Sequence, residues 1–495
     1  MTTLLPKFDF KFGDTTPVGA INRPIDEKLS DFASIKDFGA VGDGIADDSA
    51  AIQAAIDSLG NAGGTVYIPN GMKCYVNANI TVNHNVTLKG PYSKVGSPGS
   101  NSSIPYDTLS SIRLNSTYSI ILNSGAGIDG VLIYKSDLTF PIPATGYTFA
   151  GTAITGAGDD CFVINSMILG FNQAFYSTDV QRIKIIDVNI DCQNGVWIDN
   201  CLDISRVVRV HCWPFAAIGG TYTLARTGNA FYWTTLNDQG RAIDCFSYGY
   251  QYGFRIADTG MVLIGCNADT ALSINTGQIG FYVTGNAYET KFIGCQSLSQ
   301  ESGYRFNLTN GLSTTLVDCD SVSCSSTGII AEQGDVTVLG GRFSNTPTGI
   351  AVLSQTSNLI VEGCRFESIG VGGPISVDAA TGGNQLIQIG KNNYTNWNPI
   401  YPVVNSYASI PTAASATTMS IPSYGNQFLV TGTTTVTNIV SGWAGREITL
   451  LFNSIVNITD NANLHLNGNF TSAVDSTLKL VSNGYTWQEV SRSVN

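Results

Sequence analysis

The sequence predicts an all-β fold, a β-solenoid followed by a smaller β domain, on three observations. Only 13% of the residues are charged and 53 are glycine, a composition typical of strand-rich chains with many tight turns. The 495 residues are too many for one ordinary compact core, so we expect several domains or a solenoid. Two independent sequence patterns also recur with one shared period in the low twenties, which indicates stacked coils.

The first pattern is an apolar residue, any residue, and then a small or apolar residue, as in IDCF, IGCN, IGCQ and VDCD. It places one residue of each coil in the same register: Val188, Val210, Cys245, Cys266, Cys295, Cys319, Gly341 and Cys364. The flanking residues alternate between apolar and polar, which is the period of a strand. We expect the cysteines of this register to stack inside the solenoid as reduced thiols. Because the 11 cysteines occur singly, we expect no metal, no other cofactor and no disulfide framework.

The second pattern is a small residue followed by an apolar one, as in GVWI, AFYW, GFRI, GFYV and GYRF. If the apolar residue points inward, the residue after it points outward. The inward set, which we call the inner column, is Phe175, Val196, Phe231, Phe254, Phe281 and Tyr304. The outward set, which we call the outer ladder, is Tyr176, Trp197, Tyr232, Arg255, Tyr282 and Arg305. Since stacked strands lie ~4.8 Å apart, the outer ladder would form a surface column of aromatic and guanidinium planes.

The outer ladder indicates carbohydrate binding. Exposed aromatic rings suit the C–H faces of sugars, and arginine suits hydroxyls or a uronate carboxylate. We therefore expect a glycan groove in which the substrate contacts Trp197, Tyr232, Arg255, Tyr282 and Arg305. The alternative interpretation is that the same column packs against a neighbouring subunit.

A short amphipathic helix is predicted near residues 48–59. Asp47 or Asp48 can cap it, and the apolar residues of SAAIQAAIDSL share one face. The stretch SIKDFGAVGDGIADDSAAIQAAIDSLGNAGGTVYIPNG, from residue 34 to about residue 75, resembles the opening of the pectate-lyase superfamily, which includes polygalacturonase-like enzymes and many phage tailspikes. The resemblance implies a right-handed parallel β-helix, a single-stranded solenoid capped by this helix. We assign residues 34–405 to it as the catalytic domain.

The chain changes character on both sides of the predicted β-helix. From about residue 406 it becomes rich in Ser, Thr and Ala and then in short alternating strands, so residues 406–495 are predicted to form a separate β-sandwich-like domain. This region resembles the C-terminal domains of tailspike and depolymerase proteins, which implies a homotrimer and a domain that assists trimerisation or binds carbohydrate. Residues 1–33 are too few for a core of their own. We interpret them as a virion-attachment segment that contacts other phage tail proteins.

Charge and hydropathy argue against two classes of partner. The net charge is -12, so neither nucleic acid nor an anionic membrane surface would attract the chain. The sequence contains no run of ~18 apolar residues and does not open with a basic and apolar leader, so we expect no membrane insertion. The resemblance instead implies a place in the phage tail of the virion, acting at the bacterial cell surface.

Two coils are longer than the others and predict a cleft. In each coil we count the residues from the first pattern to the second. This number is larger than usual over residues 210–230 and again over residues 266–280. Both insertions leave the same edge of the solenoid with one short coil between them, and loops on a rigid scaffold commonly carry function. His211, Trp213 and Arg226 line the first insertion, HCWPFAAIGGTYTLARTG, and are predicted to bind substrate. The CWPF and GNAFYW segments here resemble a pattern seen in phage depolymerase β-helices.

Four acidic residues near the predicted cleft are candidates for catalysis: Asp238, Asp269, Glu289 and Glu301. Glycoside hydrolysis uses two carboxyl groups across the scissile bond, one as acid and the other as base or nucleophile. Asp269 with Glu301 is the leading pair, because both leave the same edge on neighbouring coils. Asp238 with Glu289 is the second pair, because one coil lies between them.

These observations and resemblances predict a phage tailspike that degrades a bacterial surface polysaccharide, a capsule or a lipopolysaccharide O-antigen. The predicted reaction is metal-independent endo-glycosidic hydrolysis. One alternative is a polysaccharide lyase on the same fold, which would abstract the proton next to a uronate carboxylate with His211 or a tyrosine. The other is a non-catalytic tail fibre that binds glycan through the outer ladder without cleaving it.

Overall fold

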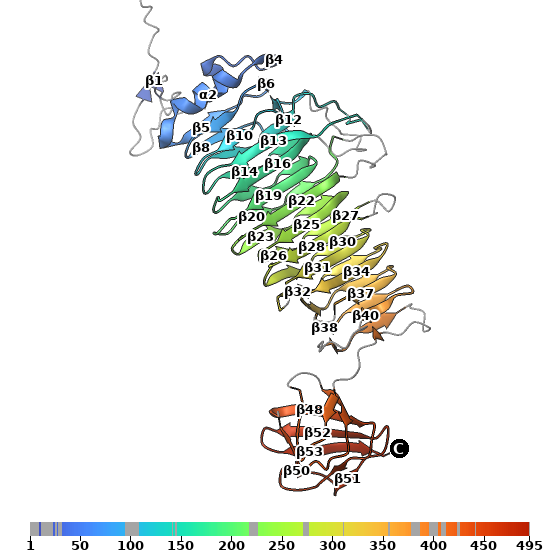
Figure 1. Ribbon diagram of the computed structural model, residues 1–495. Helices are drawn as coiled ribbons and strands as arrows, with labels where there is room; N and C mark the ends of the chain where they lie inside the picture. Colours follow the sequence, from blue (N-terminus) through green and yellow to red (C-terminus); the bar gives the residue numbers. More distant parts are fainter. Residues whose placement is uncertain are drawn as a thin grey trace, which may run out of the picture.

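The computed structural model describes most of the chain. The described residues are 32–94, 108–140, 142–143, 146–216, 226–270, 277–309, 311–354, 357–377, 387–395, 412–422, 426–440 and 442–494, with the short stretches 9–10, 23–24, 27 and 404–406. Figure 1 shows a right-handed parallel β-helix with many coils and, later in the chain, a second β domain, so the predicted fold class is confirmed. The predicted attachment segment 1–33 lies almost entirely outside the described residues. Among the few residues described there, β1 (Asp9–Phe10) and β2 (Arg23–Pro24) pair antiparallel, and Ala33 pairs with Val66 in the β-helix.

Each coil contributes one strand to each of three parallel sheets. Among the described residues the first sheet, which carries the outer ladder and is called the ladder sheet, contains 13 strands: β7 (Ile80–Val82), β10 (Ile120–Leu122), β13 (Ala150–Gly156), β16 (Phe171–Thr178), β19 (Asn194–Asp199), β22 (Arg226–Thr234), β25 (Tyr250–Ala257), β28 (Ile279–Gly285), β31 (Ser302–Leu308), β34 (Thr327–Gln333), β37 (Thr348–Val352), β40 (Gly373–Val377) and β43 (Val404–Ser406).

The second and third sheets each contain 14 strands in the described part of the chain. The second sheet comprises β3 (Ala33–Ser34), β5 (Gly64–Tyr67), β8 (Val86–Lys89), β11 (Gly127–Asp129), β14 (Phe162–Ile164), β17 (Lys184–Ile186), β20 (Arg206–Val208), β23 (Gly240–Ile243), β26 (Met261–Ile264), β29 (Thr290–Ile293), β32 (Ser313–Val317), β35 (Asp335–Leu339), β38 (Leu359–Glu362) and β41 (Ile387–Ile389). The third sheet comprises β4 (Asp43–Asp47), β6 (Lys73–Val76), β9 (Ser111–Leu114), β12 (Leu132–Lys135), β15 (Met167–Leu169), β18 (Asn189–Asp191), β21 (His211–Cys212), β24 (Phe246–Tyr248), β27 (Asn267–Asp269), β30 (Gln296–Leu298), β33 (Asp320–Val322), β36 (Arg342–Ser344), β39 (Arg365–Glu367) and β42 (Asn393–Thr395).

The corner between the second and third sheets explains the first sequence pattern. One residue there turns the chain with a left-handed backbone, for example Asp244 at φ 52° and Gly265 at φ 62°. The next residue points inward, and the four cysteines predicted to stack, Cys245, Cys266, Cys295 and Cys319, are all buried. The Cys266 thiol contacts those of Cys245 and Cys295, and burial raises its pKa well above the ordinary value. The predicted stack of cysteines inside the solenoid is therefore observed, and all four are free thiols.

The corner between the third sheet and the ladder sheet explains the second pattern. A Cβ on Gly253 would lie 2.6 Å from the carbonyl oxygen of Gly280, and one on Gly280 would lie 2.7 Å from that of Gly303. The coils approach each other so closely at this corner that only a small side chain fits between them.

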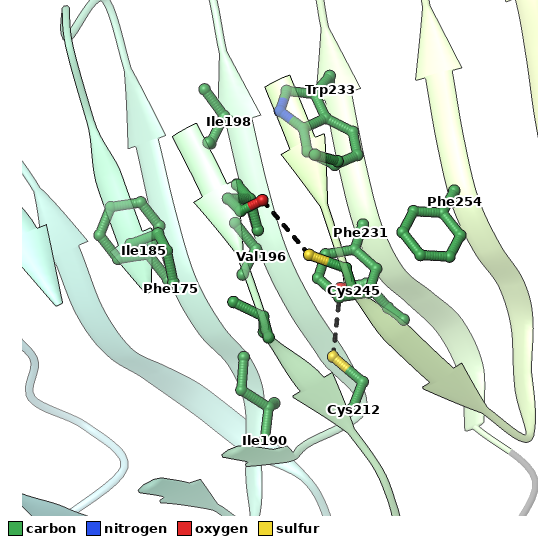
Figure 2. Packing of buried hydrophobic residues seen from close by; sticks show 14 of the residues in the cluster. Phe175, Ile185, Ile190, Val196, Ile198, Cys212, Phe231, Trp233, Cys245 and Phe254 are labelled. Carbon is green, nitrogen blue, oxygen red and sulfur yellow. Dashed lines mark hydrogen bonds between the residues drawn. The ribbon is translucent and has the colours of Figure 1, made fainter. Parts of the chain in front are cut away.

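The inner column fills the interior behind the ladder sheet. Its six residues are buried and aligned by the strand pairings in the predicted register. Ring centroids are 4.6 Å apart for Phe231 and Phe254, 4.9 Å for Phe254 and Phe281, and 4.7 Å for Phe281 and Tyr304. Figure 2 shows part of this packing, with Phe231 and Phe254 from neighbouring coils.

A short helix covers the apolar interior at the first coil. Helix α2 (Ser49–Ser58) buries Ile52, Ala55 and Ile56, and the 3-10 helices η1 (Ile35–Phe38) and η2 (Gly60–Ala62) flank it. Inspection of the described helices finds none long and apolar enough to cross a membrane.

The C-terminal region has a hydrophobic core of its own. Its main sheet is mixed and contains β44 (Thr412–Ala414), β46 (Gln427–Thr431), β48 (Ala444–Phe452), β52 (Thr477–Asn483), β53 (Trp487–Ser493) and β50 (Leu464–His465). Two smaller pairs are β45 (Thr418–Ser420) with β47 (Asn438–Val440), and β49 (Asn457–Ile458) with β51 (Phe470–Thr471). Buried Trp487 donates its indole N–H to the Ile439 carbonyl at 3.0 Å.

Candidate functional site

The outer ladder lies on the ladder sheet with its side chains partly exposed. The strand pairings align each of its members with the next, in the register that the sequence predicts: Tyr176, Trp197, Tyr232, Arg255, Tyr282 and Arg305. The six side chains therefore form one column across six consecutive coils, with the buried inner column on the other side of the same strands.

The aromatic half of the outer ladder is held in place by contacts and hydrogen bonds. The Trp197 ring lies 4.8 Å from that of Tyr176 and 5.5 Å from that of Tyr232, centroid to centroid. The Trp197 indole N–H donates to the Thr234 hydroxyl at 2.9 Å, and this hydroxyl donates to Asp199 at 2.8 Å. Such support fixes the orientation of the indole before any ligand arrives.

The other half of the outer ladder combines guanidinium groups with tyrosine rings. The Arg255 guanidinium lies 4.8 Å from the Tyr232 ring centroid and 5.9 Å from that of Tyr282, and Arg305 also lies 5.9 Å from Tyr282. Tyr252, which sequence reasoning missed, stacks on Tyr282 at 5.5 Å and lies 5.2 Å from Arg255. Tyr252 therefore belongs to the same surface.

A small hollow of about 120 Å³ adjoins the Trp197 end of the outer ladder. Its walls combine amide side chains with aromatic rings: Asn172, Gln173, Asn194, Val196, Trp197, Asn229 and Tyr232. Amides that donate and accept hydrogen bonds beside flat apolar rings match the mixed surface of a sugar. In the sequence, amide side chains recur at the same corner of successive coils, and this recurrence could have predicted the hollow.

The second carboxylate pair lies at the edge where the ladder strands end. Asp238 and Glu289 are exposed and line the same hollow of about 400 Å³, together with Arg241 and Lys291. The coil between them is short and contains Gly260. The backbone and the ring of Tyr288 lie close to this glycine. The intervening coil that weakened this pair in the sequence therefore forms part of the hollow that the two carboxylates share.

The leading carboxylate pair lies at the opposite edge, where the ladder strands begin. Asp269 ends β27 in register with Leu298, and Glu301 follows three residues later. Burial raises the pKa of Asp269 to about 6, opposed by a hydrogen bond from the Thr270 N–H. Glu301 accepts a hydrogen bond from the Gly277 N–H at 2.5 Å. The structure therefore places the two side chains on consecutive coils at one edge.

His211 and Trp213 lie around the corner from the outer ladder, on the third sheet. The His211 ring is 5.8 Å from Trp213, 5.3 Å from Phe215 and 4.9 Å from Phe246, and Trp213 lies 4.4 Å from Tyr248. Burial lowers the pKa of His211, so its imidazole is neutral at neutral pH. The two residues form an aromatic cluster on the third sheet that reaches Tyr248, which is in register with Asp269 at the edge of that sheet.

Arg226 is not on the surface of the first insertion, where the sequence placed it. It is buried and forms an ion pair with the equally buried Asp191. Asp191 also accepts a hydrogen bond from the Ala216 N–H at 2.8 Å, and the Arg226 guanidinium lies 4.9 Å from the Phe149 ring centroid. An interior carboxylate requires a cation beside it, which explains why this arginine points inward. Arg226 thus holds the base of the insertion and has no surface for direct substrate contact.

Sequence reasoning also missed a third insertion, residues 136–149, between β12 and β13. Of its described residues, Leu138 and Ile142 pack over the third sheet against the start of the first insertion, where the Ile142 N–H donates to the Ala216 carbonyl at 2.8 Å. The predicted cleft involves residues 217–225 and 271–276, which lie outside the described residues. Within the described ranges, no three His, Cys, Asp or Glu side chains are grouped so that they could hold a metal ion.

Comparison with known families and sequences finds similarity concentrated in a short stretch. The family model described as rhamnogalacturonase A/epimerase, pectate lyase-like, matches residues 32–104, which confirms the resemblance seen in the N-terminal sequence. A mannuronan C5-epimerase from Azotobacter vinelandii is 67% identical over 39 residues, 8% of this chain and 3% of that protein. Plasmin and fibronectin-binding protein A from Streptococcus pneumoniae is 55% identical over 53 residues, 10% of this chain and 7% of that protein. The chain thus spans only a small part of the curated relatives it matches.

Solved structures with a similar course of the chain are distant in sequence. The A-module of an Azotobacter vinelandii mannuronan C5-epimerase has a TM-score of 0.43 and 15% identity, over 76% of this chain and 98% of the module. The tailspike protein of the E. coli bacteriophage HK620, in complex with a pentasaccharide, has a TM-score of 0.43 and 13% identity, over 92% and 80% of the two chains. At these values the matches carry no argument about activity.

Proposed function

We propose that the protein is a phage tailspike that binds a bacterial surface polysaccharide along the outer ladder and cleaves it by endo-glycosidic hydrolysis. The observation that carries the proposal is the outer ladder itself, a partly exposed column of aromatic and guanidinium groups on a rigid sheet. Stacked rings at the coil spacing suit a long chain of sugar rings better than a single small ligand. The amide-lined hollow at one end adds hydrogen-bonding groups for sugar hydroxyls.

The catalytic step needs a carboxylic acid that holds its proton to a higher pH than an ordinary aspartate does. Asp269 meets this requirement, because burial raises its pKa from 3.8 to about 6. In the proposed mechanism Asp269 protonates the glycosidic oxygen, and Glu301 on the next coil acts as base or nucleophile. Both lie where the ladder strands begin, so a glycan on the outer ladder could pass between them.

Asp238 and Glu289 are the second proposed pair. They share the hollow at the other edge of the ladder sheet, and the adjoining Arg241 and Lys291 would stabilise negative charge there. Since the two pairs lie at opposite edges, substitutions in one pair test its catalytic role without altering the other pair.

The remaining parts of the chain receive roles that fit a tailspike. We propose that residues 34–405 form the catalytic β-helix, that residues 406–495 assist homotrimer assembly or bind carbohydrate, and that residues 1–33 attach the protein to other tail proteins. The proposed location is the phage tail of the virion, and the proposed substrate is a capsule or a lipopolysaccharide O-antigen.

The test is incubation of the full chain with purified capsular polysaccharides and O-antigens, followed by size-exclusion chromatography. Hydrolysis predicts a rapid fall in polymer size without new ultraviolet absorbance. D269N and E301Q should each abolish the fall if the leading pair is catalytic, whereas D238N and E289Q should do so if the second pair is. An unchanged polymer size with persistent binding would contradict hydrolysis and leave the non-catalytic fibre.

A lyase would produce unsaturated ends that absorb in the ultraviolet, and its predicted base was a tyrosine or His211. The outer ladder holds tyrosines beside Arg255, so a tyrosine base stays a candidate. His211 has less support from the geometry. That imidazole is neutral, as a base must be, but it lies among Trp213, Phe215 and Phe246 on the third sheet. A glycan on the outer ladder would not reach it without crossing a corner of the solenoid.

A further inference from the structure

Arg255 occupies an unusual position at the middle of the outer ladder. Its guanidinium is surrounded by three tyrosine rings, with centroids at 4.8 Å for Tyr232, 5.2 Å for Tyr252 and 5.9 Å for Tyr282. In the part of the chain that the structure describes, no carboxylate lies within ion-pairing distance of it, and its buried Nε has no hydrogen-bond partner. Aromatic faces attract a cation but accept no strong hydrogen bond, so several N–H donors remain available.

Two other arginines of the β-helix, Arg305 and Arg209, contrast with Arg255. Arg305, two coils further along the same ladder, pairs with Glu332. Arg209 on the far corner forms two hydrogen bonds of 2.7 Å with Asp187. The chain has a net charge of -12 and so many carboxylates, yet none of those in the described ranges forms an ion pair with Arg255. The side chain is partly exposed, so a ligand can reach it.

We propose that Arg255 binds the carboxylate of an acidic sugar, and that the glycan recognised by the outer ladder therefore contains uronic acid or another carboxylated residue. This inference rests on the proposed function for the location of the glycan. A planar guanidinium can hold a carboxylate by two parallel hydrogen bonds. The surrounding rings exclude water from the pair and offer flat faces to the sugar that carries the carboxylate.

The net charge of the protein bears on which cation an acidic glycan could meet. A polyanionic glycan approaching an acidic protein meets unfavourable long-range electrostatics, so an unpaired cation at the binding surface favours its carboxylates. Arg255 is placed for this task, because the neighbouring Trp197 and Tyr232 provide adjacent stacking positions at the coil spacing. A neutral glycan would offer the guanidinium only hydroxyl groups, without the charge of a carboxylate.

The experiment measures binding of two monosaccharides to the full chain by saturation-transfer NMR. Sodium glucuronate is the acidic probe and glucose is the neutral probe. We expect glucuronate to bind the natural protein at least about tenfold more tightly than glucose, and R255Q to lose this preference, since a hydrogen-bonded charge pair is worth about one such factor or more. R209Q is the matched control, because it removes the same charge from a pair on the far corner of the coil.

Each outcome decides the inference. Loss of the glucuronate preference in R255Q but not in R209Q supports it. Equal binding of the two sugars by the natural protein, or an unchanged preference in R255Q, overturns it. If the natural protein shows no glucuronate preference and R255Q alone alters the sedimentation coefficient, the column is a subunit interface instead. The binding measurement requires no cleavage, so it tests the acidic-sugar site separately from the hydrolysis. If the protein binds glucuronate through Arg255 but leaves capsules intact, the proposed hydrolysis is rejected and the acidic-sugar site is kept.

Discussion

Phe254 and Arg255 are consecutive residues of β25, yet they lie in opposite environments. Phe254 is fully buried between the rings of Phe231 and Phe281, whereas Arg255 is partly exposed among tyrosines. The same contrast repeats along the inner column and the outer ladder over six coils. Both columns use aromatic stacking at nearly the same spacing, and only the side of the strand differs.

This comparison separates stability from recognition. The inner column removes apolar area from water and contributes to folding. The outer ladder holds comparable rings partly in water, which gives less stability and leaves surface for a ligand. Substitutions on the two sides should therefore change different measurements, and the predictions below use this difference.

The largest effect is expected for Phe254→Ala. Truncating a buried phenylalanine removes its stacking partners' contacts and leaves a cavity, so the free energy of unfolding should fall by about 3–5 kcal/mol. Urea denaturation followed by circular dichroism measures it. Tyr282→Ala on the outer ladder is the comparison, with an expected loss of about 1 kcal/mol or less. Equal losses for the two variants would mean that the outer ladder is buried in the assembled protein.

Asp191→Asn should also destabilise the fold strongly. It leaves the buried Arg226 guanidinium without its carboxylate, and an uncompensated interior charge costs about 3–5 kcal/mol. The exposed Asp187–Arg209 pair provides the control, since Asp187→Asn should cost less than about 1 kcal/mol. A melting temperature of D191N equal to that of D187N would contradict the structural role assigned to the interior pair.

The sequence predicts the two columns because their causes recur in every coil. A strand alternates sides every residue, and the corner residue must be small because the next coil's carbonyl lies within 2.6–2.7 Å of any added Cβ at Gly253 and Gly280. These two constraints fix which residue points outward. Tyr252 was missed because the alternation breaks at the corner, where both Gly253 and Phe254 face inward.

Features that depend on partners far apart in sequence could not be predicted. Arg226 reads as a loop residue until Asp191, 35 positions away, is known to lie beside it in the interior. The insertion at residues 136–149 precedes the coils in which the two sequence patterns recur. Its extra length could therefore not be recognised by comparison with regular coils. The hollow shared by Asp238 and Glu289 likewise depends on the three-dimensional course of the short coil between them.

Trp197→Ala should weaken polysaccharide binding with little change in stability. Removing a central ring of a binding surface commonly costs tenfold or more in affinity, and the side chain is only partly buried. Isothermal titration with a cleaved oligosaccharide measures the loss. Thr234→Val is a finer variant, since it keeps the ring but removes the 2.9 Å hydrogen bond that orients it, and about fivefold weaker binding is expected. Unchanged affinity in both variants would place the glycan elsewhere.

The smallest effect is a pH dependence that D269N should remove. Burial raises the pKa of Asp269 from its ordinary value of 3.8 to about 6, so the folded state favours the protonated form. Its stabilising contribution is complete below about pH 4 and is lost as the pH rises through 6. The melting temperature of the natural protein should therefore fall relative to that of D269N between these values, whereas D57N, altered on the exposed side of α2, should follow the natural protein. If Asp269 is also the general acid, turnover should decline above pH 6 as its proton is lost. A melting curve that stays parallel to that of D269N across this range would show that the carboxyl is solvated, and the acid role would then pass to the pair at the other edge of the ladder sheet.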